Sequence, residues 1–228
     1  MSCPLSSELG NASVESANHV IFAFLRFCRK AFLMHGSNKL IWRREMKNLF
    51  KVDLDVKTMV QLAMFMAITI ILGYVNKIIP EMPQGGALIS IDVVAIFLCA
   101  YLMGAGYGII CGIGVSILQF VLAIATYWGP WSVLLDYVLP LAVCGIAPML
   151  KSTKIKNIPI YWGIILSMIL KYLCHFASGA FLFAEYAPEG INPIIYSLTY
   201  NLPYNFTTLL LCMVVVPILY KRLKGVLR

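Results

Sequence analysis

The stretch LAMFMAITIILGY, residues 62–74, holds no charged side chain, and its apolar residues do not alternate with polar ones. The stretch VLPLAVCGIAPML, residues 138–150, has the same character. A membrane-spanning β-strand needs alternation, with apolar residues facing lipid and polar residues facing the lumen. Because helices and closed barrels are the two structures that can span a bilayer, both stretches predict helices.

Six apolar stretches follow in the chain from Thr58, each near the length of about 20 residues that a helix needs to cross the hydrocarbon core. They cover roughly residues 58–79, 88–103, 107–126, 131–150, 159–183 and 197–220. We therefore expect an all-α fold: a polytopic membrane protein whose residues 58–228 form a six-transmembrane-helix bundle.

The composition agrees with a protein that is dissolved in lipid. Hydrophobic residues make up 61% of the 228 positions and charged residues 12%, and the mean hydropathy is +0.84. Soluble domains carry about 45–50% apolar and about 25% charged residues. The seven cysteines show no paired spacing, so neither a disulfide framework nor a metal site is predicted.

The formal charge of +8 is concentrated in three places along the chain. Basic residues precede the first predicted span, separate the fourth from the fifth, and follow the sixth: Lys47, Lys51, Lys57; Lys151, Lys154, Lys156; Lys221, Arg222, Lys224, Arg228. With six spans these clusters fall on one side, which the positive-inside rule makes cytoplasmic. Both termini are then cytoplasmic, and the basic charge needs no nucleic-acid partner.

Residues 1–57 are predicted to be an extension of the membrane domain. Their apolar run is interrupted by Arg26, Arg29 and Lys30, so it is too short and too charged to span. Two interpretations stay open. The run could be an amphipathic helix at the membrane interface, or Met46 could be the natural start of translation.

Polar side chains inside predicted spans point to function, because burying them in lipid is costly. With the orientation above they lie in the outer halves of three helices: Asp136 and Tyr137 in the fourth span, Lys171 and His175 in the fifth, and Tyr196, Tyr200 and Asn201 at the start of the sixth. Gln119 of the third span could join them. Their convergence predicts a binding cavity for a small, flat, nitrogen-rich cation, since aromatic faces attract cations and a carboxylate pairs with an aminopyrimidine edge. Each also has a plainer explanation, such as a structural Lys171–Asp136 salt bridge or interfacial tyrosines.

Two patterns of small residues predict helix packing. Gly104, Gly108 and Gly112 recur every four residues, which lets transmembrane helices approach closely. Ala63 and Ala67 have the same spacing in the first span. The chain lacks the phosphate-binding loop G-x-x-x-x-G-K-[ST], so it is not expected to hydrolyse ATP by that route.

A resemblance to a known family covers about residues 56–224. It begins with KYLCHF at residues 171–176, continues with YAPEG at 186–190, and ends with the pairs Tyr196-Ser197 and Tyr200-Asn201. In this succession the chain resembles the thiamine-specific S-components of energy-coupling-factor (ECF) transporters. Asp136-Tyr137 resembles the acid–tyrosine pair of that family, and Ala63-xxx-Ala67 resembles the alanine motif that docks on the transmembrane coupling subunit.

The resemblance implies roles for individual residues. Asp136, His175, Tyr196 and Asn201 would contact the aminopyrimidine and neighbouring rings of thiamine, while Tyr137 and Lys171 would serve its hydroxyethyl or phosphate end. Phe183 stands where family members have a tryptophan, and the acid is Asp rather than Glu. Trp128 and Trp131 could compensate, so a pyrimidine precursor of thiamine stays open as the ligand.

The resemblance also implies a binding and translocation subunit in the bacterial cell membrane. It would need no cofactor of its own, because two ATPase subunits would use the ATP and a coupling subunit would transmit the work. Two other classes stay open: a membrane-embedded enzyme with Asp136 and His175 as an acid–base pair, and a stand-alone transporter or channel.

Overall fold

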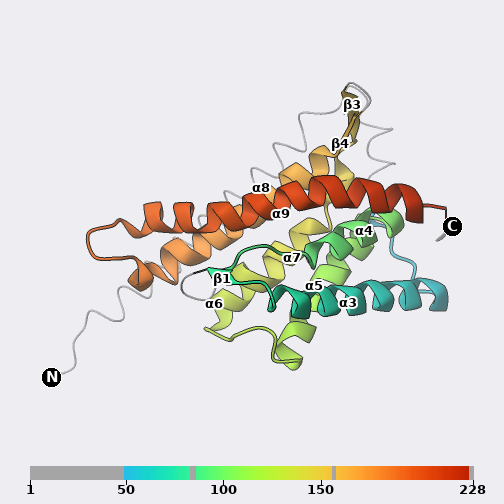
Figure 1. Ribbon diagram of the computed structural model, residues 1–228. Coiled ribbons are helices and arrows are strands. Elements are labelled where there is room, and N and C mark those ends of the chain that lie inside the picture. The colour runs from blue at the N-terminus through green and yellow to red at the C-terminus, as the bar shows by residue number, and fades with distance from the viewer. Residues whose placement is uncertain (1–48, 83–85, 156–157, 226–228) are drawn as a thin grey trace.

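The computed structural model describes residues 49–82, 86–155 and 158–225 (Figure 1). The described chain is a bundle of helices with two short β-hairpins, which confirms the predicted all-α membrane fold class. Most of the predicted extension, residues 1–48, falls outside the described residues, and the helix of the first predicted span begins at Val56 rather than at Thr58.

Each predicted span overlaps one helical segment, although several bounds differ by about five residues. The segments are α3 (Val56–Asn76), α4 (Val93–Met103), α5 (Ala105–Val121), a composite of α6 (Pro130–Ser132), the π-helical turn Val133–Val138 and α7 (Leu139–Cys144), then α8 (Trp162–Phe181) and α9 (Pro193–Leu223). Among the described residues, α3, α8 and α9 are long and apolar enough to cross a membrane, whereas the other segments are shorter. The hairpins pair β1 (Glu81–Met82) with β2 (Gly86–Ala87) and β3 (Thr153–Ile155) with β4 (Ile158–Ile160), both antiparallel.

The short helix α4 forms the centre of the core. All residues from Val93 to Ala100 are buried, and α4 packs against α3, α5, α7 and α9. The long helices α8 and α9 lie side by side along one edge of the bundle and α3 along the other (Figure 1). The apolar residues that remain exposed on α3 and α9 face outward, as expected for helices in contact with lipid.

Two of the three repeated glycines lie where α5 crosses α7. A Cβ atom at Gly108 would lie 2.8 Å from the Cα of Gly145, and one at Gly112 would lie 2.4 Å from the carbonyl oxygen of Leu141. The helices could not approach this closely with larger residues, so the packing interpretation holds for these two. Gly104 differs, because with φ +123° it forms the break between α4 and α5.

A proline explains the irregular fourth segment. Pro140 has no N–H to donate to the carbonyl four residues earlier, and its ring collides with that carbonyl in a regular helix. The carbonyl in question belongs to Asp136, which lies in the π-helical turn. The wider turn relieves the collision, and it also changes the direction in which Asp136 and Tyr137 project.

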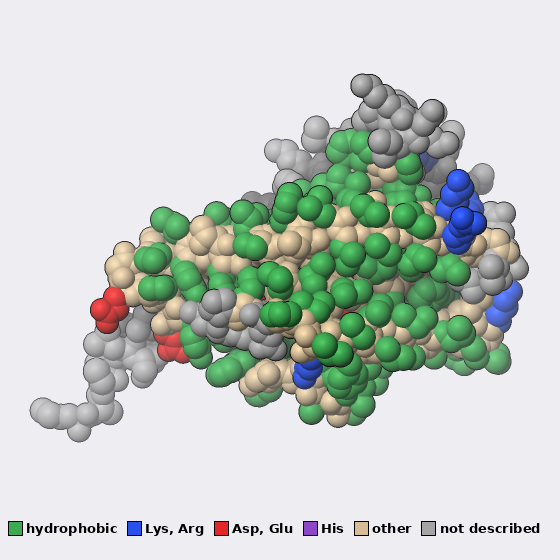
Figure 2. Space-filling model, in the orientation of Figure 1, with side chains coloured by type: hydrophobic (Ala, Val, Ile, Leu, Met, Phe, Trp, Pro, Cys, Tyr) green, Lys and Arg blue, Asp and Glu red, His purple; other side chains and the backbone are tan. Residues whose placement is uncertain are grey.

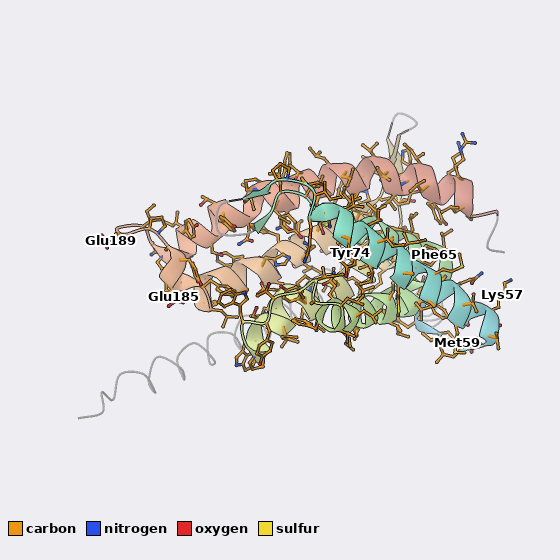
Figure 3. All side chains as sticks on the ribbon, turned by 60° about the horizontal axis from the view of Figure 1, so that its bottom comes forward. Lys57, Met59, Phe65, Tyr74, Glu185 and Glu189 are labelled. Carbon is orange, nitrogen blue, oxygen red and sulfur yellow. The ribbon has the colours of Figure 1, made fainter. Side chains whose placement is uncertain are left out.

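The two ends of the bundle differ in their charged side chains. On the face shown in Figure 2, most Lys and Arg side chains gather at one end and the acidic ones at the other. Figure 3 places Glu185 and Glu189 at one end and Lys57 at the other. The first turn of α3 lies at the basic end, where the Asp55 carboxylate accepts from the backbone N–H of Thr58 as an N-cap. The Thr58 contact also lowers the pKa of the Asp55 carboxyl.

Candidate functional site

A cavity of about 460 Å³ opens between the fourth helical segment, α8 and α9. It lies at the end of the bundle that carries Glu185 and Glu189 (Figure 3). Its size is within the usual range for small-molecule sites. The lining residues are Trp128, Ser132, Asp136, Tyr137, His175, Ser178, Gly179, Phe183, Tyr186, Tyr196, Ser197, Tyr200 and Asn201.

The Asp136 carboxylate is held by two hydroxyl groups from different elements. Its Oδ2 accepts from Ser132 Oγ at 2.8 Å and from Ser178 Oγ at 2.7 Å. Its Oδ1 lies 3.5 Å from His175 Nδ1, and the side chains of this pair keep 20% and 14% exposure. Two donors on one oxygen fix the carboxylate, while the other oxygen faces the imidazole at the wall of the cavity.

The imidazole of His175 is oriented from its other nitrogen by Lys171. Lys171 Nζ lies 3.1 Å from His175 Nε2 and donates to the Tyr204 hydroxyl at 2.6 Å. An ammonium group can only donate, so Nε2 is the acceptor and the ring proton sits on Nδ1, facing Asp136. Lys171, His175 and Asp136 therefore form a directed chain of contacts that selects one tautomer.

Lys171 lies outside the large cavity. It is 1% exposed and lines a second cavity of about 220 Å³. Among the described residues it forms no ion pair with Asp136, because His175 lies between them. The four-residue spacing correctly places Lys171 and His175 on one face of α8. Because Lys171 lies one turn before His175, however, it lines the second cavity and not the larger one.

Helix α9 contributes an amide and two phenols. Asn201 Nδ2 donates to the carbonyl oxygen of Ser197 at 2.9 Å and to that of His175 at 3.4 Å. The rings of Tyr196 and Tyr200 lie 5.7 Å apart. The two helices approach closely here because Gly179 has no side chain: a Cβ at that position would lie 2.4 Å from Ser197 Oγ.

Aromatic rings form the mouth of the cavity. Phe183 contacts the Trp128 ring at a centroid distance of 6.1 Å and the Tyr186 ring at 5.9 Å. Such edge-to-face clusters offer ring faces and edges to a flat ligand. Trp128 is therefore placed to contribute as the sequence suggested, whereas Trp131 is not among the lining residues.

Six of the seven predicted substrate-binding residues thus line one cavity: Asp136, Tyr137, His175, Phe183, Tyr196 and Asn201. Sequence reasoning assigned no binding role to four hydroxyl-bearing residues that line the cavity: Ser132, Ser178, Tyr186 and Ser197. Ser132 precedes Asp136 by four residues and Ser178 follows His175 by three, so helical spacing could have revealed both. Gln119 lines the second cavity instead.

No group of three or more His, Cys, Asp or Glu side chains suited to a metal ion occurs in the part of the chain that the structure describes. Five cysteines of that part are buried: Cys99, Cys111, Cys144, Cys174 and Cys212.

The predicted docking residues lie on the outer surface. Ala63 and Ala67 are both exposed on α3, between larger side chains that are also exposed: Val60, Met64, Ile68 and Ile71. They do not pack inside the bundle, where α3 buries Leu62, Phe65, Thr69, Ile70 and Gly73.

Comparison with known proteins shows similarity at the level of family, sequence and structure. The family model described as "Thiamine transporter protein" matches residues 59–227. The chain is 30% identical over 172 residues to "Thiamine transporter ThiT" of Bacillus subtilis, with 71% of this chain and 89% of the relative covered. A solved structure of ThiT from Listeria monocytogenes aligns with a TM-score of 0.61 at 18% identity, over 75% of this chain and 96% of the other. This last similarity concerns the fold.

Proposed function

Because the chain belongs to the thiamine transporter protein family, we propose that its large cavity binds thiamine and that the protein is the substrate-capturing subunit of an ECF-type importer. Family membership makes the chain a multi-pass protein of the bacterial membrane and a transporter rather than an enzyme. The main support for this site is the carboxylate of Asp136, which two serine hydroxyls hold in place in a cavity lined by aromatic residues.

The chemistry of thiamine matches this cavity. The aminopyrimidine offers an N–H donor beside a ring nitrogen, which a carboxylate and an amide can recognise. We assign Asp136, His175, Tyr196 and Asn201 to the pyrimidine and neighbouring rings. The cationic thiazolium is attracted by aromatic faces, and Phe183 and Trp128 offer these at the mouth. Tyr137 and Lys171 line the second cavity, where they would meet the hydroxyethyl end.

The direct test is binding by the purified chain in detergent. Calorimetric titration with thiamine, its phosphates and its pyrimidine half, a hydroxymethylpyrimidine, ranks the candidates. Tightest binding of thiamine supports the proposal. Tightest binding of the pyrimidine half would make a precursor the substrate, and no binding of any of them would refute the site.

The charged ends support entry from the extracellular side. Lys57 lies at the end of the bundle opposite to Glu185 and Glu189 (Figure 3). The last turn of α9, which carries Lys221 and Arg222, ends on the same side as the first turn of α3 (Figure 1). The positive-inside rule makes the basic end cytoplasmic. The large cavity, which lies at the acidic end, then opens outward.

The exposed stripe on α3 supports a partner. Ala63 and Ala67 are one helical turn apart and leave a shallow groove between larger apolar side chains. In lipid, helix association depends on close packing rather than on expelling water, so small residues mark contact points. We assign this groove to the transmembrane coupling subunit, which would link the chain to two ATPase subunits.

Replacing both alanines by tryptophan tests this assignment. Ala63→Trp with Ala67→Trp should abolish ATP-dependent uptake in vesicles that contain the coupling subunit and ATPases. Thiamine binding by the isolated chain should stay intact, since the groove lies away from the cavity. A matched control places two tryptophans at Val214 and Ile218, which are also exposed one turn apart, on α9.

Uptake by the double alanine variant at the parental rate would contradict the docking assignment. Loss of binding in that variant would also contradict it, because the alanines would then serve the bundle itself. Uptake by the unmodified chain in vesicles without ATPases would instead show a stand-alone transporter.

A further inference from the structure

Helix α9 is longer than the hydrocarbon core of a bilayer requires. Its 31 residues extend about 46 Å at 1.5 Å per residue, whereas the hydrocarbon core is about 30 Å thick and the bilayer with its headgroups about 40–45 Å. At least one end of α9 therefore reaches the depth of the lipid headgroups. The sequence marks the C-terminal end, where the exposed apolar residues Ile218 and Leu219 are followed directly by Tyr220 and two basic residues.

Three basic side chains in this last stretch have no acidic partner in the part of the chain that the structure describes. Lys221, Arg222 and Lys224, the α9 basic turn, are exposed, and no carboxylate of the described residues forms an ion pair with them. By contrast, Lys51, just before α3, pairs with Asp53 at 2.8 Å. On the face shown in Figure 2, basic side chains gather over the end of α9. The surface thus offers three positive charges that the described residues do not balance.

Three tyrosine rings pack together at the end of the bundle that carries these cations. The Tyr220 ring lies 5.8 Å from that of Tyr101 on α4 and 6.4 Å from that of Tyr161, the residue before α8. Lys224 Nζ lies 5.6 Å from the centroid of the Tyr220 ring. Tyrosines are enriched where hydrocarbon meets headgroups, because the ring is apolar and the hydroxyl is polar. The cluster joins the ends of three helices at this depth, so the basic turn is attached to a packed part of the bundle.

The start of α8 lies at the same depth. Trp162 is 43% exposed, and its Nε1–H donates to Thr153 Oγ1 at 2.7 Å. Thr153 begins β3, and the β3–β4 hairpin projects from the bundle beside the start of α8 (Figure 1). An exposed indole with a satisfied N–H is suited to the interface between lipid chains and headgroups. Both helices that form this edge of the bundle therefore enter the headgroup layer here.

We infer that the α9 basic turn binds the phosphate group of anionic phospholipids. A phosphodiester carries one negative charge on two free oxygens, and the planar guanidinium of Arg222 can donate to both. Lys221 and Lys224 add positive charge beside it. The lipid chains then lie along the exposed apolar side chains of Ile218 and Leu219, which precede the basic turn.

The depth of the basic turn favours a lipid over an acidic protein segment, because exposed apolar residues lead up to it without a gap. Clusters of Lys and Arg next to a transmembrane helix attract anionic lipids. A zwitterionic phospholipid brings an ammonium of its own, which the three cations repel. The surface should therefore distinguish anionic from zwitterionic lipids. This inference goes beyond the proposed function, since neither cavity includes the residues of the basic turn.

The test measures lipid binding to the purified full chain in detergent by native mass spectrometry. The probes are phosphatidylglycerol, which is anionic, and phosphatidylcholine, which is zwitterionic, with identical acyl chains. We expect the parent to bind phosphatidylglycerol at least tenfold more tightly, because each basic group contributes about fivefold. The triple variant Lys221→Gln, Arg222→Gln and Lys224→Gln should lose this preference, while its Kd for phosphatidylcholine changes less than twofold.

Control variants separate a defined surface from general charge. Lys57→Gln removes an exposed cation at the same end of the bundle but on α3, at the other edge (Figures 1 and 3), and should keep the preference within twofold. Arg222→Lys keeps the charge and should weaken phosphatidylglycerol binding less than Arg222→Gln does. If the triple variant has a lowered thermal midpoint without added lipid, Arg222→Gln alone serves as the test, with an expected rise in Kd of about fivefold.

Parental lipid preference in the triple variant would overturn the inference. An equal loss in Lys57→Gln would also overturn it, because the net charge of the whole end would then attract the lipid. If the triple variant keeps its lipid Kd but no longer assembles with the proposed coupling subunit, the surface belongs to an acidic protein partner and the lipid assignment is wrong. Thiamine binding by the triple variant should equal that of the parent, so this inference and the proposed function fail independently.

Discussion

The Asp136→Asn variant probes the centre of the proposed site most sharply. In the parent chain, Oδ2 accepts from the hydroxyls of Ser132 and Ser178, and Oδ1 faces the ring proton on His175 Nδ1. An asparagine can turn its oxygen toward the serines, but its NH₂ group then opposes the imidazole N–H. The tautomer cannot change to relieve this, because Lys171 donates to Nε2.

The magnitude follows from the hydrogen bonds that this substitution removes. A hydrogen bond to a charged partner contributes about 1.5–3 kcal/mol net, and at least one such bond to the ligand disappears with the carboxylate. The Kd for thiamine should therefore rise between about tenfold and a hundredfold. Ser132→Ala, which leaves the charge in place, should cost less, about 0.5–1.5 kcal/mol for a neutral bond of ordinary strength.

The assay is calorimetric titration in detergent, with the thermal midpoint of each variant measured alongside. Asp53→Asn is the matched control, because it makes the same substitution in an exposed salt bridge with Lys51, and it should bind as the parent does. If folded Asp136→Asn binds thiamine within threefold of the parent, the carboxylate does not contact the ligand and the site assignment is wrong.

Three more outcomes are expected. A single cysteine at Glu189 should react with an impermeant reagent from outside the cell, and one at Lys154 only after permeabilisation; the reverse pattern would invert the orientation. Gly108→Ala should lower the free energy of unfolding by about 1–3 kcal/mol through overpacking, and so lower the thermal midpoint. Gly225→Ala, where a Cβ meets nothing within 4 Å, should leave the midpoint unchanged. Equal midpoints of the two variants would contradict the close crossing of α5 and α7. Phe183→Ala should weaken thiamine binding by about 0.5–1.5 kcal/mol, and unchanged affinity would place the ligand away from the mouth.

The helical bundle could be predicted because lipid leaves few choices. Every backbone polar group within the membrane must be paired inside its own segment or in a closed barrel, so stretches without alternation had to be helices. The points at which one helix ends and the next begins depend on single residues. Gly104 belongs to a repeat of small residues that predicts packing, but its backbone conformation makes it the junction of α4 and α5.

The sequence predicts which helices carry the residues of the candidate site, but not the contacts between their side chains. Placing Asp136 and His175 at one depth needed only the span boundaries and the orientation. Lys171 contacts Asp136 only through His175, and this depends on how α8 is rotated about its axis. The spacing of Lys171 and His175 in the sequence does not fix that rotation. The π-helical turn at Asp136 was signalled by Pro140, but the resulting direction of the side chain requires coordinates.

The shortness of the inner helices has a consequence for ligand size. Helix α4 has 11 residues, about 17 Å at 1.5 Å per residue, against a hydrocarbon core of about 30 Å. It can be short because it is enclosed by its neighbours and has no lipid thickness to match. Both cavities begin at the ends of shorter helical segments: Asp92 precedes α4, Gln119 lies in the last turn of α5, and Ser132 lies in the first turn of the fourth segment. The ends of these shorter segments therefore form the floor of the cavities, next to the longer helices α3, α8 and α9. Lengthening one of the shorter segments by a turn would raise that floor by about 5 Å, so a bundle of this design can be refitted to a smaller or larger vitamin without changing the helices that face the membrane.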